Sequence, residues 1–184
     1  MKPEINQKAR LTLITGPVRS GKTRLALELA LRFPEPRIYL ATAQALDSEM
    51  TKRIARHQTE RGSAFQTLEE PIQISSRLRE IQPRPSIVVV DCLTLWLNNL
   101  FGVGGEEGQG VQEKLEELIA VLNMMEPPVI LIGNEVGWGI VPENALVRNF
   151  RDLSGRLNQE IARIADQVIL MVAGIPLIVK GNRT

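Results

Sequence analysis

The sequence predicts a single α/β domain in which a mostly parallel central sheet carries helices on both faces. Short apolar runs alternate along the 184 residues with longer segments whose apolar residues recur at helical spacing. Most of these longer segments can form the helical crossover that two parallel strands require. The last two apolar runs are too close together for a crossover. We therefore expect an antiparallel pair at one edge of the sheet, near the C-terminus.

The expected strands are short and apolar. Ile87–Val90 is the clearest, because one isoleucine and three valines stand together and Asp91 ends the run. The last two strands are predicted to be separated by a Gly-Ile-Pro turn at 174–176. In chain order, the sequence predicts strands over 11–15, 37–42, 65–68, 87–90, 129–132, 168–172 and 177–179.

The expected helices are bounded by capping and helix-breaking residues. Asp47 is a good N-cap for a helix that runs to Arg61, and Gly62 supplies its end. We predict helices over 23–32, 47–61, from Pro71 to the prolines at 83 and 85, and over 93–101, 111–125 and 143–165. The glycine- and acid-rich segment 102–110 is predicted to be a loop, and residues 1–10 a short flexible lead-in.

Composition excludes several classes of protein. The net charge is +1 with both signs mixed along the chain, so no basic face for nucleic acid is expected. The single cysteine, Cys92, rules out an internal disulfide framework and zinc sites built from paired cysteines. No apolar run approaches the roughly 18–20 residues of a membrane span, and there is no signal-peptide pattern. We expect one cytoplasmic domain over residues 1–184, without membrane or nucleic-acid partners.

A glycine-rich loop follows the first predicted strand. It fits the phosphate-loop (P-loop) pattern G-x-x-x-x-G-K-[ST], and a predicted helix follows it. The glycines let backbone N–H groups surround a phosphate, Lys22 would reach the β and γ phosphates, and the Thr23 hydroxyl would bind Mg²⁺. The alternative is a glycine-rich turn without a ligand. The candidate nucleotide-binding residues of this loop are Gly16, Pro17, Val18, Arg19, Ser20, Gly21, Lys22 and Thr23, although Pro17 has no N–H to donate.

Asp91 is the candidate for a second magnesium ligand and a further nucleotide contact. It ends a hydrophobic strand, where P-loop enzymes place an acid that holds the metal. A helix cap for 93–101 is the other interpretation, and the two are compatible.

The P-loop motif does not identify the substrate. The N-K-x-D motif of guanine-specific switches does not follow the strand at 129–132, and segment 102–110 has no arginine of the kind found in kinase lids.

The loop is one of four blocks that carry a wider sequence resemblance. They read GPVRSGKT at 16–23, IYLATAQALDSEMTKRIARHQTERG at 38–62, VVVDCLTLWLNNL at 88–100 and NEVGWGIVPENALVRNFRDLSGRLNQ at 134–159. From about Leu11 to Lys180 the chain resembles the bifunctional adenosylcobinamide kinase / adenosylcobinamide-phosphate guanylyltransferase family of vitamin B12 assembly. The family's loop usually begins with two glycines and ends in serine, whereas Pro17 and Thr23 stand here. Threonine keeps the hydroxyl that binds the metal.

The resemblance implies two reactions on one P-loop domain. ATP or GTP phosphorylates a hydroxyl of adenosylcobinamide, and GTP then transfers GMP to that phosphate through a covalent guanylyl-histidine. Subunits would form a trimer. Other interpretations are a monofunctional P-loop kinase or nucleotidyltransferase acting on another small molecule, and a nucleotide-dependent regulatory module that turns nothing over.

The resemblance places the guanylylated histidine at His57. It is the only histidine of the chain, and an imidazole can attack phosphorus and form a reactive phosphoramidate. The residues alone leave another interpretation open. Met50, Ile54 and His57 share one face of a helix, so His57 could simply pack against the core.

The resemblance assigns further nucleotide contacts, some of them with alternatives. Arg61 is the candidate for the triphosphate charge, although Arg56 and Arg61 could also belong to a solvated helix face. Glu69 could equally be a surface glutamate. Because attack at the γ and the α phosphorus needs different geometry, we expect the 47–62 helix to move. The assigned contacts are Thr42, Ala43, Gln44, Gln58, Thr59, Glu60, Arg61 and Glu69, with Asn134, Glu135 and Glu143 placed toward the corrinoid.

Overall fold

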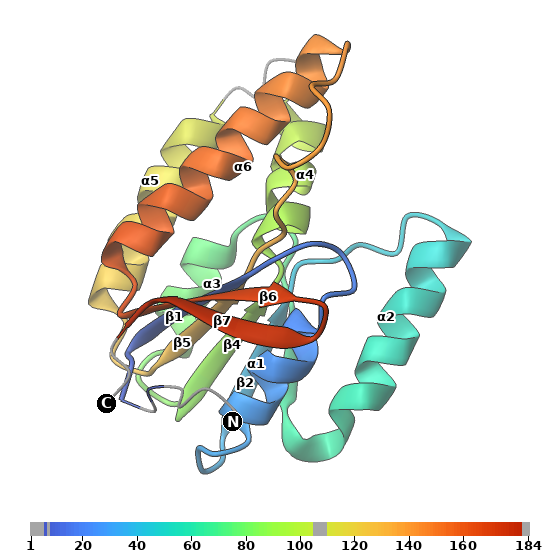
Figure 1. The fold of residues 1–184 in the computed structure, drawn as a ribbon. Coiled ribbons are helices and arrows are strands. Elements are labelled where there is room, and N and C mark those ends of the chain that lie inside the picture. The colour runs from blue at the N-terminus through green and yellow to red at the C-terminus, as the bar shows by residue number, and fades with distance from the viewer. Residues whose placement is uncertain (1–5, 7, 105–109, 182–184) are drawn as a thin grey trace.

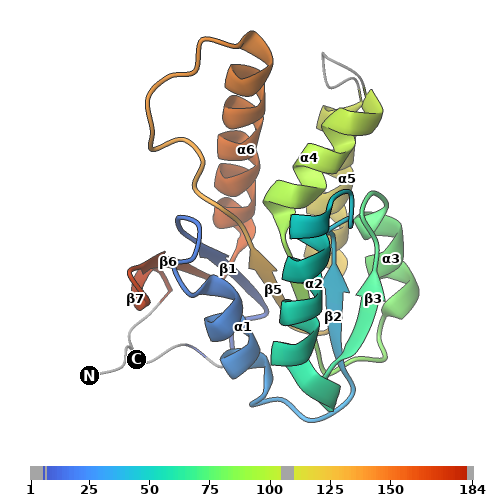
Figure 2. The ribbon, with the colours of Figure 1, turned by 90° about the vertical axis from the view of Figure 1, so that its right-hand side faces the viewer.

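The computed structural model describes residue 6 and residues 8–104 and 110–181. In this part of the chain one seven-stranded sheet runs through the molecule in the order β3-β2-β4-β5-β1-β6-β7 (Figures 1 and 2). All neighbouring strands are parallel except β6 and β7. The strands are β1 (Leu11–Thr15), β2 (Arg37–Ala41), β3 (Gln66–Glu69), β4 (Ile87–Asp91), β5 (Val129–Ile132), β6 (Gln167–Val172) and β7 (Ile175–Lys180).

Helices connect the parallel strands. They are α1 (Lys22–Ala30), α2 (Ser48–Arg61), α3 (Ile74–Ile81), α4 (Leu93–Gly104), α5 (Val111–Met124) and α6 (Ala145–Ile164), and a short 3₁₀ turn, η1 (Gly62–Ala64), follows α2. The predicted caps of α2 are present. The Asp47 side chain accepts a hydrogen bond from the Met50 N–H, and Gly62 ends the helix with a φ of 58°.

Strand β1 lies in the interior of the sheet, between β5 and β6. Leu13 is in register with Leu131 of β5 and Val168 of β6. All five residues of β1 are buried, as expected for a strand covered on both faces. The predicted parallel α/β architecture is therefore confirmed, and the loop that follows β1 opens at the interior of the sheet.

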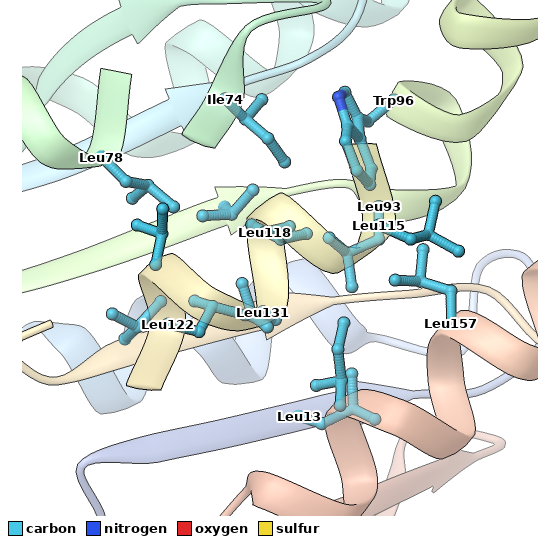
Figure 3. Close-up of a cluster of buried hydrophobic side chains, with 14 of the residues drawn as sticks. Leu13, Ile74, Leu78, Leu93, Trp96, Leu115, Leu118, Leu122, Leu131 and Leu157 are labelled. Atoms are coloured by element: carbon cyan, nitrogen blue, oxygen red, sulfur yellow. The ribbon is translucent and has the colours of Figure 1, made fainter. Parts of the chain in front are cut away.

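Two hydrophobic clusters, one on each face, hold the three layers together. Figure 3 shows part of the larger one, in which Leu13 and Leu131 of the sheet meet Leu118 of α5 and Leu157 of α6. The smaller cluster packs α1 against residues such as Ile14 on the other face. Burial of alternate strand residues on opposite faces thus fixes the three-layer arrangement.

The predicted turn between the last two strands was wrong in position. The turn is Ala173-Gly174, with φ values of 50° and 81°, and Ile175 and Pro176 already belong to β7. A two-residue turn with positive φ at both positions matches the right-handed twist of a hairpin. Pro176 is tolerated because β7 is an edge strand, so its missing N–H does not interrupt hydrogen bonding between two inner strands.

Two further boundaries differ from the sequence prediction. Helix α4 continues to Gly104, so the first three residues of the predicted 102–110 loop are helical, while 105–109 lie outside the described residues. Most of the predicted 1–10 lead-in is likewise outside the description. Its end is anchored, because the Arg10 N–H donates to Asp166 (2.8 Å) and its guanidinium donates to the Asn123 carbonyl (3.0 Å). Over the described ranges, no helix combines the length and apolarity needed to cross a membrane.

The larger hydrophobic cluster makes a direct prediction about stability. Leu118 is fully buried in it, so Leu118→Ala removes side-chain contacts and leaves a cavity. We expect the free energy of unfolding to fall by about 2–5 kcal/mol in urea titrations. The control is Glu116→Ala on the exposed side of the same helix, which should change it by less than about 0.5 kcal/mol. Equal effects of the two changes would contradict this packing.

Candidate functional site

A cavity of about 560 Å³ lies at the carboxyl ends of the parallel strands. It is bounded by the P-loop, by residues at or just after the ends of β2, β3, β4 and β5, and by one side of α2. Open α/β sheets usually bind their ligands at this edge. The cavity lining includes the following predicted site residues: Arg19, Ser20, Gly21, Lys22, Thr23, Ala43, His57, Gln58, Arg61, Glu69, Asp91 and Asn134.

The P-loop is shaped to accept an anion. Gly21 precedes α1 with a φ of 92° and provides no side-chain cap, so the first N–H groups of the helix are left for a ligand. The Lys22 ammonium donates to the carbonyls of Gly16 (2.9 Å) and Pro17 (2.7 Å), and so lies against the start of the loop. This arrangement suits a nucleotide's phosphates.

The β6–β7 hairpin supports the loop from one side. Gly16 has a φ of 144°, and a Cβ added there would lie 2.4 Å from the Met171 carbonyl oxygen of β6. The N–H of Gly174, in the hairpin turn, donates to the Ser20 carbonyl at 3.1 Å. The antiparallel pair at the sheet edge therefore fixes the backbone of the phosphate loop as well as closing the sheet.

Asp91 joins the loop to the strands beside it. Its Oδ2 accepts hydrogen bonds from the Thr23 hydroxyl (2.9 Å) and from the Tyr39 hydroxyl (2.5 Å). A hydroxyl and a carboxylate oxygen in contact are ligands that Mg²⁺ prefers, together with phosphate oxygens and water. Within the described residues, no backbone N–H of α4 donates to Asp91. The Leu95 N–H instead contacts the Cys92 sulfur at 3.4 Å, so helix capping does not explain Asp91.

Tyr39 is a site residue that the sequence did not reveal. It is the only tyrosine of the chain and lines the cavity from β2. Burial and then the neighbouring Asp91 raise the pKa of its hydroxyl far above the usual value, so it remains a donor. The same two causes raise the pKa of the Cys92 thiol to about 12. The Arg61 guanidinium lies 4.0 Å from the centre of the Tyr39 ring and is almost completely buried.

Helix α2 turns its least exposed face to the cavity. Met50, Ile54 and His57 are half-buried, all three line the cavity, and neither hydrophobic cluster includes them. Figure 1 shows α2 standing beside α1, apart from α4, α5 and α6. The apolar spacing that left core packing open for His57 is thus explained by a face that covers the cavity.

Several predicted contacts lie elsewhere. Thr42 is fully buried, and its hydroxyl donates to the Cys92 carbonyl and accepts from the Cys92 N–H, both at 2.8 Å. These bonds give Thr42 a structural role between β2 and β4. The Thr59 hydroxyl is exposed and donates to the Ala55 carbonyl of its own helix. Outside the cavity lining also lie Gly16, Pro17, Val18, Gln44, Glu135 and Glu143, while the side chain of Glu60 is not described.

Comparison with known proteins identifies the family. Residues 12–179 match the family model described as cobinamide kinase / cobinamide phosphate guanyltransferase. This chain belongs to that family. It is 41% identical over 170 residues to the bifunctional adenosylcobalamin biosynthesis protein CobP of Pseudomonas aeruginosa, covering 92% of this chain and 97% of the relative. It is 36% identical over 181 residues to CobU of Salmonella typhimurium, covering 92% and 99% of the two chains.

Solved structures bear out the fold. The KaiC-like protein PH0186 of Pyrococcus horikoshii superposes with a TM-score of 0.53 at 16% identity, covering 98% of this chain and 86% of that chain. The flagellar accessory protein FlaH of Methanocaldococcus jannaschii gives a TM-score of 0.51 at 14% identity, covering 94% and 79%. Identities this low speak for the shared α/β architecture alone. The family assignment rests on the sequence matches.

The contact between Gly16 and β6 can be tested with one methyl group. Gly16→Ala places a Cβ against the Met171 carbonyl and strains a positive φ, so the loop must shift. We expect nucleotide affinity to fall at least about tenfold, or about 1.4 kcal/mol, in titrations with a fluorescent GTP analogue. Gly155→Ala, in α6 with no atom near the added Cβ, should leave affinity unchanged. Unchanged affinity in Gly16→Ala would contradict this geometry.

Proposed function

We propose that this chain carries both activities of its family. It would phosphorylate adenosylcobinamide with ATP or GTP, then transfer GMP from GTP to the new phosphate through a guanylyl group on His57. The observation that carries the proposal is the shared cavity: the only histidine of the chain faces the same space as Lys22 and Asp91. A P-loop alone explains triphosphate binding, whereas a histidine beside it provides a nucleophile for nucleotidyl transfer.

The phosphorylation step depends mainly on positioning and charge. The substrate hydroxyl attacks the γ phosphorus, and a nucleoside diphosphate leaves. Lys22 and the N–H groups at the start of α1 would stabilise the triphosphate, which the P-loop holds in place. Thr23 and Asp91 would hold Mg²⁺, and the bound ion would neutralise charge on the β and γ phosphates.

Guanylyl transfer uses the α phosphorus instead. An imidazole nitrogen of His57 attacks it, an N–P bond forms, and the bond to the bridging oxygen breaks as pyrophosphate leaves. A phosphate oxygen of the phosphorylated substrate then attacks the guanylyl phosphorus. The N–P bond breaks, the imidazole is released, and adenosylcobinamide-GDP forms. Arg61, buried at the end of α2, would place its positive charge beside the triphosphate.

The two steps place different demands on α2. His57 must approach the α phosphorus only for guanylyl transfer, and most of α2 is exposed. We therefore propose that α2 moves between the steps, while the P-loop stays fixed against β6. Identical positions of α2 in structures with and without GTP would contradict this movement.

The nucleophile can be tested by covalent labelling. With GTP labelled at the α phosphate, we expect the protein to acquire a label that survives alkali and is lost in acid, as a phosphoramidate should. His57→Ala should abolish the label and retain phosphorylation of adenosylcobinamide, because it leaves the P-loop intact. Lys22→Ala is the matched control and should reduce both reactions. A label that persists in His57→Ala would exclude this nucleophile.

The metal site can be tested at Asp91. Asp91→Asn keeps the shape of the side chain and removes its charge, so binding of Mg²⁺ with the nucleotide should weaken. We expect the Mg²⁺ concentration for half-maximal phosphorylation to rise about tenfold or more, which corresponds to about 1.4 kcal/mol. Glu49→Gln, an exposed acid on the α2 side of the cavity, serves as control and should leave it unchanged. An unaltered Mg²⁺ dependence in Asp91→Asn would contradict this assignment.

A further inference from the structure

We propose that Glu135 is the general base of the phosphorylation step. Its carboxylate would take the proton of the substrate hydroxyl as that oxygen attacks the γ phosphorus. The inference rests on the proposed kinase activity and adds to it a residue that acts in only one of the two reactions. It starts from a hydrogen-bond network just beyond the end of β5.

The backbone places Glu135 beside the start of the P-loop. Strands β5 and β1 are parallel neighbours, and the Glu135 N–H donates to the Gly16 carbonyl at 3.1 Å. The same carbonyl accepts a hydrogen bond from the Lys22 ammonium at 2.9 Å. A P-loop lysine serves the β and γ phosphates. Glu135 therefore lies on the side of the loop where the phosphate to be transferred would be held.

The side chain is held in place at one oxygen. Oε1 of Glu135 accepts hydrogen bonds from the Thr15 hydroxyl (2.5 Å) and from the Asn158 amide (3.1 Å). Thr15 ends β1 and is buried, and Asn158 belongs to α6. Among the described residues, no hydrogen bond to Oε2 is seen. A carboxylate fixed at one oxygen with the other left for a substrate proton is suited to act as a base.

The other acids near the cavity are less suitable. Oδ2 of Asp91 already accepts from Thr23 and Tyr39, and its position suits the metal. Glu69 ends β3, an edge strand separated from β1 by β2, β4 and β5. Glu49 is exposed on α2. Asn134, next to Glu135 in the chain, lines the cavity, so Glu135 lies in the segment at the border of the cavity.

The phosphorylation step with Glu135 as base needs no further reactant. The hydroxyl oxygen forms a bond to the γ phosphorus, and the bond from that phosphorus to the bridging oxygen breaks. The nucleoside diphosphate leaves with the electron pair, and the hydroxyl proton passes to Oε2 of Glu135. Guanylyl transfer requires no such base, because its nucleophiles are an imidazole nitrogen and a phosphate oxygen. Loss of Glu135 should therefore separate the two reactions.

Glu135→Gln tests the inference, because glutamine retains an oxygen for Thr15 and Asn158 but is not a base. We expect phosphorylation of adenosylcobinamide to slow by about 10²–10⁴-fold. Labelling of His57 by GTP, and GMP transfer to adenosylcobinamide phosphate supplied ready-made, should stay within about twofold of the unmodified enzyme.

Two further variants complete the experiment. Glu135→Asp keeps a carboxylate and should recover part of the phosphorylation rate lost in Glu135→Gln. Glu113→Gln, an exposed change on α5 outside the cavity lining, should alter neither reaction. The inference is overturned if Glu135→Gln phosphorylates within about tenfold of the unmodified enzyme, or if both reactions fall in parallel, as loss of a purely structural contact would produce. If the unmodified enzyme neither phosphorylates nor labels, the proposed function itself fails.

Discussion

The carboxylate of Asp91 accepts hydrogen bonds from Thr23, at the start of α1, and from Tyr39 of β2, both at Oδ2. The Tyr39 ring in turn lies beneath the Arg61 guanidinium, at the end of α2. One continuous series of contacts thus links the P-loop to the helix that carries His57. Because Tyr39 and Arg61 are buried, these contacts are shielded from water and stronger than they would be at the surface. The relation between phosphate loop and histidine helix depends on them.

The parallel sheet explains why two chemistries can share this site. Carboxyl ends of neighbouring parallel strands lie at one edge, so residues far apart in sequence converge there. Asp91 ends β4, Glu135 follows β5 and the P-loop follows β1, and the register of these strands places them together. On this account Glu135 and the metal ligands serve transfer of the γ phosphate, while His57 serves transfer from the α phosphate. The nucleotide bound by the P-loop is common to both.

Local patterns made the fold and the phosphate loop predictable. The run at 87–91, the caps at Asp47 and Gly62, and the glycines at 16 and 21 each act through their immediate neighbours, and all are present as expected. Parallel pairing followed from the length of the connections. The position of the hairpin turn was predicted wrongly. Pro176 favoured a turn by its residue type, whereas the turn includes Ala173, which adopts a positive φ that is unusual for alanine.

Features set by strand order could not be read from the sequence. Tyr39 sits in an apolar strand, and its contact with Asp91 exists only because β2 and β4 are neighbours. The Glu135 network needs β5 beside β1 for the same reason. Met50, Ile54 and His57 share one helix face, and spacing alone could not decide whether that face meets the core or a cavity. The proposed role of His57 came from the family resemblance. Thr42 lies in one of the blocks that carry the resemblance and was predicted to contact the nucleotide, but its hydroxyl donates a hydrogen bond to the Cys92 carbonyl.

The central claim is that His57 faces the nucleotide held by the P-loop, and its solitary imidazole permits a direct measurement. Diethyl pyrocarbonate modifies imidazoles, so the rate at which the chain's only histidine reacts can be followed without interference from others. We expect a saturating, non-hydrolysable GTP analogue to slow this reaction strongly in the unmodified protein. In Lys22→Ala, at a concentration too low to saturate the weakened site, the analogue should protect little. An unchanged reaction rate with the analogue bound to the unmodified protein would show that His57 and the triphosphate do not share a site.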